Sequence, residues 1–129
     1  MNKILVEVSV GELFDKISIL EIKKDRIKDS NKLRFINEEY EVLKNELDKN
    51  IKIDEKLAKF FTALKNVNSK LWIIEDDKRK CEKDSDFGEN FIRLSRDVHF
   101  LNDTRAKIKL DINNHTGSKI KEIKEYTNY

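Results

Sequence analysis

The chain contains no proline, three glycines and a single cysteine in 129 residues. Proline and glycine punctuate turn-rich sheets, so their scarcity favours long helices. One cysteine excludes an intramolecular disulfide framework and is typical of a reducing compartment. No apolar run approaches the roughly 20 residues of a membrane span, and no small-residue cleavage site follows the first ten residues. We therefore expect a cytoplasmic protein without a membrane segment.

Positive and negative residues are also nearly equal in number. The chain has 27 basic and 25 acidic residues, a formal net charge of +2. The two signs are interleaved, so no face gathers the positive charge that indicates a nucleic-acid partner. Charged residues make up 40% of the chain, against a usual value of about 25%. The apolar residues are nevertheless periodic, which distinguishes the chain from a disordered one.

Apolar residues recur at alternating spacings of four and three in four segments, the pattern of amphipathic helices. Four such helices with short connections predict an all-α, four-helix bundle-like fold, with residues 1–129 as one domain. Residues 1–8 predict a short extended arm or strand. Residues 118–129 form a tail, expected to be a fifth short helix or a strand beside the arm. Seven seam residues are expected at the centre of one core: Leu13, Ile17, Leu64, Leu71, Phe91, Leu94 and Val98.

Several helix ends are predicted from capping residues. Ser9 followed by Glu12 is a capping box that begins the first helix. Asp54 is suited to the N-cap of the third helix and Asp86 to that of the fourth, and Gly117 is suited to a left-handed C-cap. The third and fourth helices are longer than the second. Their unmatched ends would expose apolar surface, so we expect a homodimer.

Arg105 occupies a position of the fourth seam where an apolar side chain is expected. A buried guanidinium needs an acceptor, because an unpaired buried charge costs several kcal/mol. We therefore predict that Arg105 is buried and contacts an acidic residue of the first or third helix, Glu12, Asp15 or Glu75. The alternative is an arginine that extends along the surface and keeps its charged end in water.

Acidic residues on neighbouring helices also allow a metal site. Glu12 and Asp15 are three residues apart on one helix, Glu75 and Asp76 lie on another, and Asp103 adds a fifth carboxylate. Magnesium prefers oxygen ligands, and helical bundles supply them in this way. This arrangement resembles that of the all-α nucleotide pyrophosphatases of the MazG type, which implies magnesium-dependent nucleotide hydrolysis. The match is partial, since the chain has one E-x-x-D and no E-x-x-E to partner it at the expected place.

Other site signatures are missing. His99 and His115 have no partners at metal-ligand spacing, and Cys81 stands alone, so zinc is not expected. Cys81 falls on an apolar seam and is predicted to lie in the core. Neither of the glycine-rich phosphate-binding motifs occurs. The sequence therefore names no cofactor, and magnesium belongs only to the hydrolase alternative.

Short motifs run through most of the chain: Val8-Ser9-Val10-Gly11-Glu12-Leu13, Asp15-Lys16, Leu71-Trp72, Ile74-Glu75-Asp76-Asp77, Asp86-Phe87-Gly88, Asn102-Asp103 and Arg105-Ala106. Together they resemble a family of small bacterial and phage-encoded helical proteins of unknown function. The resemblance implies no activity. Its positions are rich in charged and amide residues, which favours a shared polar cluster over separate solvated surfaces.

The candidate ligand residues lie on three of the predicted helices: Lys16, Lys23, Arg26, Arg79, Arg93, Asn102 and Arg105. The planar fork of arginine binds phosphate oxygens in pairs. We therefore predict a binding module whose polar cluster holds an anionic small molecule, such as a nucleotide or a sugar phosphate. Two alternatives stay open: the magnesium-dependent hydrolase, and a structural adaptor in which the polar network only fixes the helix register.

Overall fold

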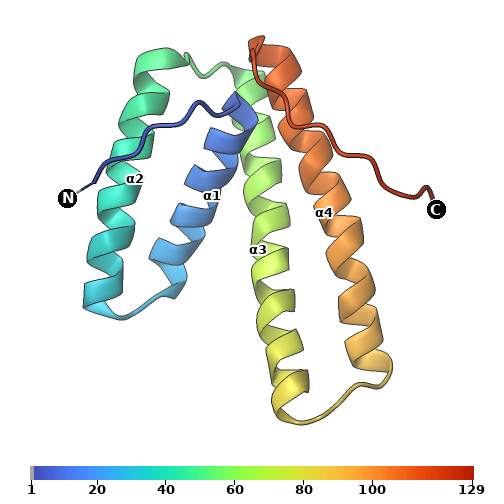
Figure 1. The fold of residues 1–129 in the computed structure, drawn as a ribbon. Helices are drawn as coiled ribbons and strands as arrows, with labels where there is room; N and C mark the ends of the chain where they lie inside the picture. The colour runs from blue at the N-terminus through green and yellow to red at the C-terminus, as the bar shows by residue number, and fades with distance from the viewer. Residues whose placement is uncertain (1) are drawn as a thin grey trace.

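The computed structural model describes residues 2–129, and among these it contains four helices and no strand. The helices are α1 (Val10–Arg26), α2 (Ser30–Asn50), α3 (Glu55–Lys83) and α4 (Glu89–Thr116) (Figure 1). The predicted all-α, bundle-like fold is confirmed. Residues 2–8 lie ahead of α1 without regular structure, and Met1, the first residue of the predicted arm, lies outside the described residues. None of the helices in this part of the chain is long and apolar enough to cross a membrane.

Three of the four predicted capping residues are confirmed. The Ser9 hydroxyl accepts a hydrogen bond of 3.1 Å from the backbone N–H of Glu12 at the start of α1. Asp54 accepts one of 2.8 Å from the N–H of Leu57 at the start of α3. Gly117 ends α4 with a φ of 66°, the left-handed conformation that suits glycine. Capping is a local interaction, which is why the sequence predicts it well.

The start of α4 and the tail differ from the prediction. The N-cap of α4 is Gly88, and Asp86 instead accepts a hydrogen bond from the N–H of Gly88 at 3.2 Å. The carboxylate is thus used within the turn and caps no helical N–H. Residues 118–129 form neither helix nor strand. Side chains tie this tail to the helices at separate points, where Ser118 contacts Val10 and Glu122 contacts Lys109.

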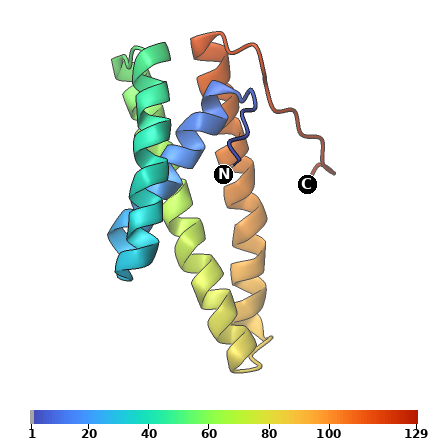
Figure 2. The ribbon, with the colours of Figure 1, turned by 60° about the vertical axis from the view of Figure 1, so that its left-hand side comes forward.

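Helix α1 is the centre of the packing, because it contacts each of the other three helices, and α3 also packs along α4. All four helices contribute to the main hydrophobic core, which contains Phe14, Ile17, Leu47, Leu57, Leu64 and Ile112. The α3–α4 hairpin continues beyond the ends of α1 and α2 (Figures 1 and 2). The core is therefore concentrated where the four helices overlap.

The predicted core is correct in part. Ile17, Leu64 and Leu94 are buried. The other four residues predicted at its centre, Leu13, Leu71, Phe91 and Val98, are only half-buried. Phe91 and Val98 lie towards the projecting hairpin, where each helix has a single neighbour and a seam residue keeps one side open to water. This reason does not apply to Leu13, which lies on α1. Cys81 is buried, as predicted.

The projecting hairpin has the unmatched apolar surface that the helix lengths predicted. Ile73, Phe87 and Ile92 are exposed there, although they are large and hydrophobic. Scattered exposed apolar residues are common on monomers, so this surface does not by itself indicate a partner. The homodimer stays a prediction.

Candidate functional site

The first turn of α1 lies directly against α4. The backbone N–H of Gly11 donates a hydrogen bond of 2.7 Å to the side-chain oxygen of Asn113. A Cβ atom on Gly11 would lie 2.5 Å from the backbone carbonyl oxygen of Lys109. Only glycine permits so close an approach of the two backbones. This contact brings the next turn of α1, which carries Asp15, to face α4.

Asp15 is the centre of a buried polar network between α1, α3 and α4. Its side chain is 2% exposed. One carboxylate oxygen accepts hydrogen bonds from Arg105 Nε at 3.0 Å and from Asn68 Nδ2 at 2.8 Å. The other accepts from Arg105 Nη2. The predicted contact between Arg105 and an acidic residue is therefore confirmed. The predicted burial of Arg105 is wrong in degree, because its side chain stays 29% exposed at the edge of the helix contact.

The network continues on both sides of Asp15. Asn68 also donates to the Ser18 hydroxyl at 2.8 Å. On the other side, Lys109 Nζ donates to Glu12 at 2.8 Å and to Glu122 at 2.9 Å, and lies 3.8 Å from Asp15. We call these residues the Asp15 network: Glu12, Asp15, Ser18, Asn68, Arg105, Lys109 and Glu122. Among the described residues, every buried polar side-chain atom has a hydrogen-bond partner, as a stable buried network requires.

The electrostatics of the network keep its central groups charged at neutral pH. Burial raises the pKa of Asp15, but hydrogen bonds from Arg105 and Asn68, with the charges of Arg105 and Lys109, outweigh it and hold the pKa below its usual 3.8. Burial alone would lower the pKa of Lys109. The hydrogen bonds from Lys109 to Glu12 and Glu122, together with the charges of Asp15 and Glu12, have the larger effect, so the pKa of Lys109 is raised above its ordinary value. Cations and carboxylates alternate through the Asp15 network. Their ion pairs hold α1 against α4.

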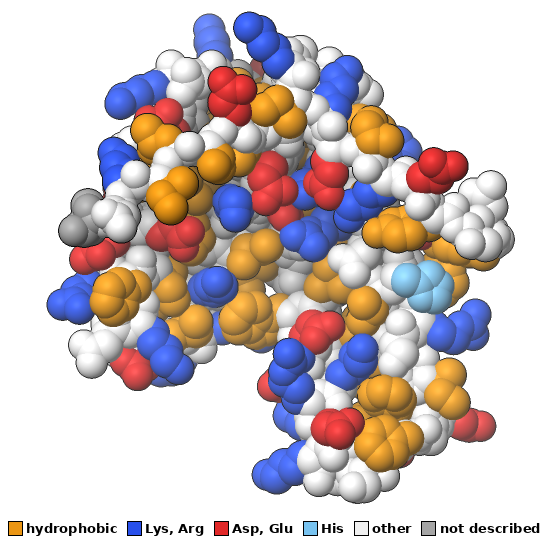
Figure 3. Space-filling model, in the orientation of Figure 1, with side chains coloured by type: hydrophobic (Ala, Val, Ile, Leu, Met, Phe, Trp, Pro, Cys, Tyr) orange, Lys and Arg blue, Asp and Glu red, His pale blue; other side chains and the backbone are white. Residues whose placement is uncertain are grey.

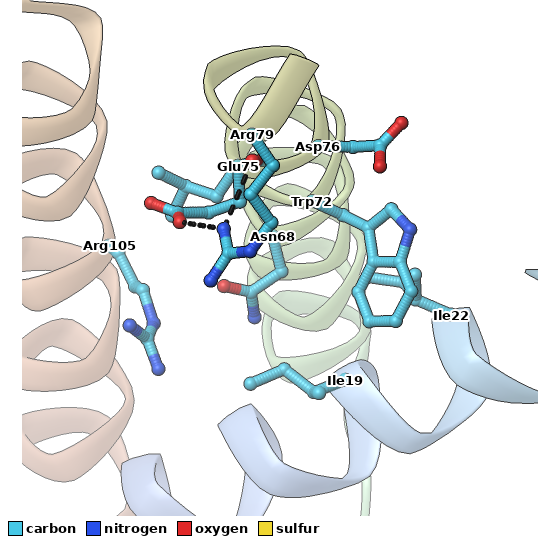
Figure 4. A pocket seen from close by; sticks show the side chains of 9 residues that line it. Ile19, Ile22, Asn68, Trp72, Glu75, Asp76, Arg79 and Arg105 are labelled. Carbon is cyan, nitrogen blue, oxygen red and sulfur yellow. Dashed lines mark hydrogen bonds and ion pairs between the residues drawn. The ribbon is translucent and has the colours of Figure 1, made fainter. Parts of the chain in front are cut away.

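A pocket of about 470 Å³ opens beside the network between α1, α3 and α4. It is lined by Ile19, Ile22, Asn68, Leu71, Trp72, Glu75, Asp76, Arg79 and Arg105 (Figure 4). Hydrophobic side chains are visible at the inner corner between the α1–α2 half and the projecting hairpin (Figure 3). The pocket therefore combines an apolar wall with a few charged groups, the usual make-up of a small-molecule site.

The two arginines of the pocket are held differently. Arg105 uses Nε and Nη2 on Asp15, and its Nη1 donates no hydrogen bond within residues 2–129. Arg79 donates to the carboxylate of Glu75 at 2.7 Å, in a pair that is largely exposed. Figure 4 shows both guanidinium groups on the side of the pocket where α3 faces α4. Arg105 is thus fixed, whereas Arg79 is held by an exposed contact only.

The structure brings two of the seven candidate ligand residues, Arg79 and Arg105, to this pocket. Lys16 is exposed, 3.8 Å from Glu12. Arg93 is also exposed and donates to Asn90 at 2.7 Å on the projecting hairpin. The five candidates that do not line the pocket are Lys16, Lys23, Arg26, Arg93 and Asn102.

The five carboxylates of the metal alternative are not gathered into one cluster. Within residues 2–129, no group of three or more histidine, cysteine, aspartate or glutamate side chains is placed to hold a metal ion. The oxygens of Glu12 and Asp15 accept hydrogen bonds from Lys109 and Arg105. Glu75 pairs with Arg79, Asp76 with Lys80, and Asp103 contacts Tyr129 near the chain end. This arrangement lends the magnesium alternative no support.

Sequence reasoning missed five residues of this region: Ser18, Asn68, Lys109, Asn113 and Glu122. A usable signal was present in the spacing. Gly11, Asp15 and Ser18 follow one another at steps of four and three along α1, so they share a face that small and polar residues dominate. On α4, Lys109 and Asn113 continue the row of Arg105 at steps of four. Two such rows predict a close polar contact between the helices.

Fold and site together define a small all-α protein in which a buried ion-pair network joins α1 to α4 beside an amphipathic pocket. The chain belongs to the family described as "Family of unknown function (DUF6165)", whose profile matches residues 4–129. No curated protein and no solved structure shows significant similarity to it. The resemblance seen in the sequence is confirmed to this extent; its signature motif and its bacterial and phage origin stay predictions.

Proposed function

We propose that the protein binds a small molecule that combines a ring with one anionic group, such as a nucleoside monophosphate or a sugar phosphate. The observation that carries this proposal is the fixed orientation of Arg105 at the pocket. Asp15 binds one edge of the guanidinium through Nε and Nη2, and Nη1 remains for a ligand. A donor held in place before binding loses little freedom when it binds. The single cysteine is buried and free, which suits a cytoplasmic role.

The ring of the ligand would lie against the apolar wall. Trp72 lines the pocket together with Ile19, Ile22 and Leu71. The face of an indole ring stacks on planar rings and on the apolar faces of sugars, and such contacts contribute about 0.5–1.5 kcal/mol beyond the area they bury. The indole is therefore the group that we expect to recognise the neutral part of the ligand.

The anionic group would lie between the two arginines. Arg79 is held by Glu75, four residues before it, in an exposed pair. Such a pair contributes only about 0.2–0.5 kcal/mol, so a ligand phosphate can replace the carboxylate at little cost. Arginine forks bind phosphate oxygens in pairs. The ligand would thus be held by one fixed and one movable guanidinium.

The carboxylates at the pocket limit the charge of the ligand. Glu75 and Asp76 both line the same space. They would repel a polyphosphate, because like charges at close range disfavour each other. They can accept hydrogen bonds from hydroxyl groups. A monophosphate that also carries hydroxyls fits this combination better than a triphosphate.

A thermal-shift screen tests the proposal with adenosine monophosphate and glucose 6-phosphate as probes, and with adenosine and glucose as uncharged controls. A ligand that binds only the folded protein raises the melting temperature by mass action. We expect one phosphorylated probe to raise it and its uncharged control to have little effect. Arg79→Gln should weaken binding about tenfold, which corresponds to the loss of one charge-assisted hydrogen bond.

Arg96→Gln is the matched control, because it removes the same charge from an exposed position of α4 outside this pocket. It should leave the shift unchanged. Equal shifts from adenosine and adenosine monophosphate, or equal losses in the two variants, would contradict the role given to the arginines.

A structural adaptor is the second candidate, and the closed Asp15 network favours it. Its cations and carboxylates satisfy one another without a ligand. Such a network can fix helix register on its own. In that case none of the probes would shift the melting temperature, while the network variants would still destabilise the fold.

A further inference from the structure

Residues 2–8 form an exposed apolar segment ahead of α1, unlike the rest of this highly charged chain. Ile4, Leu5 and Val6 are 83%, 81% and 75% exposed. The segment is not helical, and no backbone hydrogen bond joins it to any other described residue. Exposed strand-forming residues with unpaired backbone groups are a template for pairing with another chain. The partner chemistry must therefore be sought in the segment's own sequence.

We propose that this segment pairs with the same segment of a second copy, as two antiparallel strands related by a twofold axis at Leu5. Residues 3–7 read Lys-Ile-Leu-Val-Glu, a pattern that is self-complementary when it is reversed. The positive residue stands at one end, the negative residue at the other, and three apolar residues lie between them. A twofold contact requires such self-complementarity.

The register of the pair follows from this symmetry. With Leu5 opposite Leu5 of the second copy, Lys3 lies opposite Glu7 of that copy, and Ile4 lies opposite Val6. Side chains alternate between the two faces of a strand. One face would therefore carry the leucine pair between two ion pairs, and the other would carry only aliphatic residues. A slip by one residue would place charged groups opposite apolar ones, so this register is specified.

The strength of the association is bounded by the size of the segment. An isolated two-stranded ribbon is marginally stable in water, and small interfaces belong to weak or transient complexes. We therefore expect a weak, reversible dimer that forms only at high protein concentration. The homodimer predicted from the helix lengths would have used the apolar surface of the α3–α4 hairpin. In this proposal the dimer forms through residues 2–8 instead.

Sedimentation equilibrium over a range of concentrations tests the proposal on the full chain. The wild-type protein should be a reversible dimer. Leu5→Lys should raise the dissociation constant about tenfold or more, because lysine on an edge opposes strand pairing. Ile123→Lys, the same change in the equally exposed tail, is the matched control and should leave it unchanged.

A charge swap tests the register. Lys3→Glu and Glu7→Lys should each place like charges opposite one another and raise the dissociation constant about fivefold, whereas the double variant should restore it. Circular dichroism should show the same helical melting for all variants, since the substituted residues of the arm, Lys3, Leu5 and Glu7, are exposed. A monomeric wild type, a double variant no better than the singles, or a dimer lost through Ile123→Lys or Phe87→Lys would overturn the proposal.

Discussion

Replacing Asp15 with alanine is expected to lower the free energy of unfolding by about 3 kcal/mol, the low end of the range for breaking a buried ion pair. The change leaves Arg105 and Asn68 without their shared acceptor, and it removes the carboxylate that lies 3.8 Å from Lys109. Arg105 keeps some access to water, which is why the low end applies. Urea denaturation at neutral pH measures the difference. A marginally stable domain has only about 5–15 kcal/mol in total.

Asp25→Ala is the control for this change, because Asp25 is an exposed carboxylate of the same helix. It should alter stability by less than about 0.5 kcal/mol. The pH dependence provides a second check. Because the pKa of Asp15 is lowered in the folded protein, its stabilising effect is present above the usual pKa of 3.8 and lost as the pH falls through the lowered value. The stability difference between wild type and Asp15→Ala should therefore shrink below pH 3.8. A difference that is small at neutral pH, or constant with pH, would contradict the network.

Gly11→Ala is expected to cost about 2–3 kcal/mol, at the upper end of the range for overpacking. The new Cβ would lie 2.5 Å from the backbone carbonyl of Lys109. A backbone carbonyl cannot turn aside as a side chain can, so α1 must move away from α4. That movement would stretch the hydrogen bond from Gly11 to Asn113 and the contacts of Asp15. Thermal or urea unfolding measures the loss.

Gly88→Ala is the matched control for Gly11→Ala. A Cβ on Gly88 meets only a side-chain oxygen of Asp86 at 3.5 Å, an ordinary contact. Its φ of −81° is open to any residue. Because Gly88 is the N-cap of α4 and alanine caps less well, we expect a loss of at most about 1 kcal/mol, well below that of Gly11→Ala. If both variants lost stability equally, the close approach of α1 to α4 would not be the cause.

The helix ends and the central ion pair were predictable because each depends on a short-range or single-residue signal. Ser9, Asp54 and Gly117 cap helices through neighbours a few residues away. Arg105 is a charged residue at a position of the fourth helix where the pattern calls for an apolar one. Because a buried charge needs a partner, this position predicted the ion pair. The choice of Asp15 among three acidic candidates was not predictable. It depends on the approach of α1 to α4 at Gly11, which is a tertiary contact.

The missed features share one physical origin, the arrangement of the helices in space. Lys109 and Asn68 are buried but lie outside the apolar seams, so apolar periodicity gave no signal for them. Phe91 and Val98 lie on the apolar seam of α4 but are only half-buried. The α3–α4 hairpin extends beyond the ends of α1 and α2, so no further helix of residues 2–129 covers that part of the seam. The pocket arises at that same step, where α1 ends and the hairpin continues. Helix length is visible in the sequence, but the relative placement of the helices is not.

The most direct measurement of the central claim is the fluorescence of Trp72, the only tryptophan of the chain, which lines the pocket. Adenosine monophosphate and glucose 6-phosphate would be titrated into the wild-type protein and into Arg79→Gln, with free tryptophan as the absorption blank. We predict a saturable change in emission for one of the two probes, displaced about tenfold to higher concentration in Arg79→Gln. No saturable change with either probe, or curves that are identical in the two proteins, would contradict an anion-binding pocket at Arg79 and Arg105.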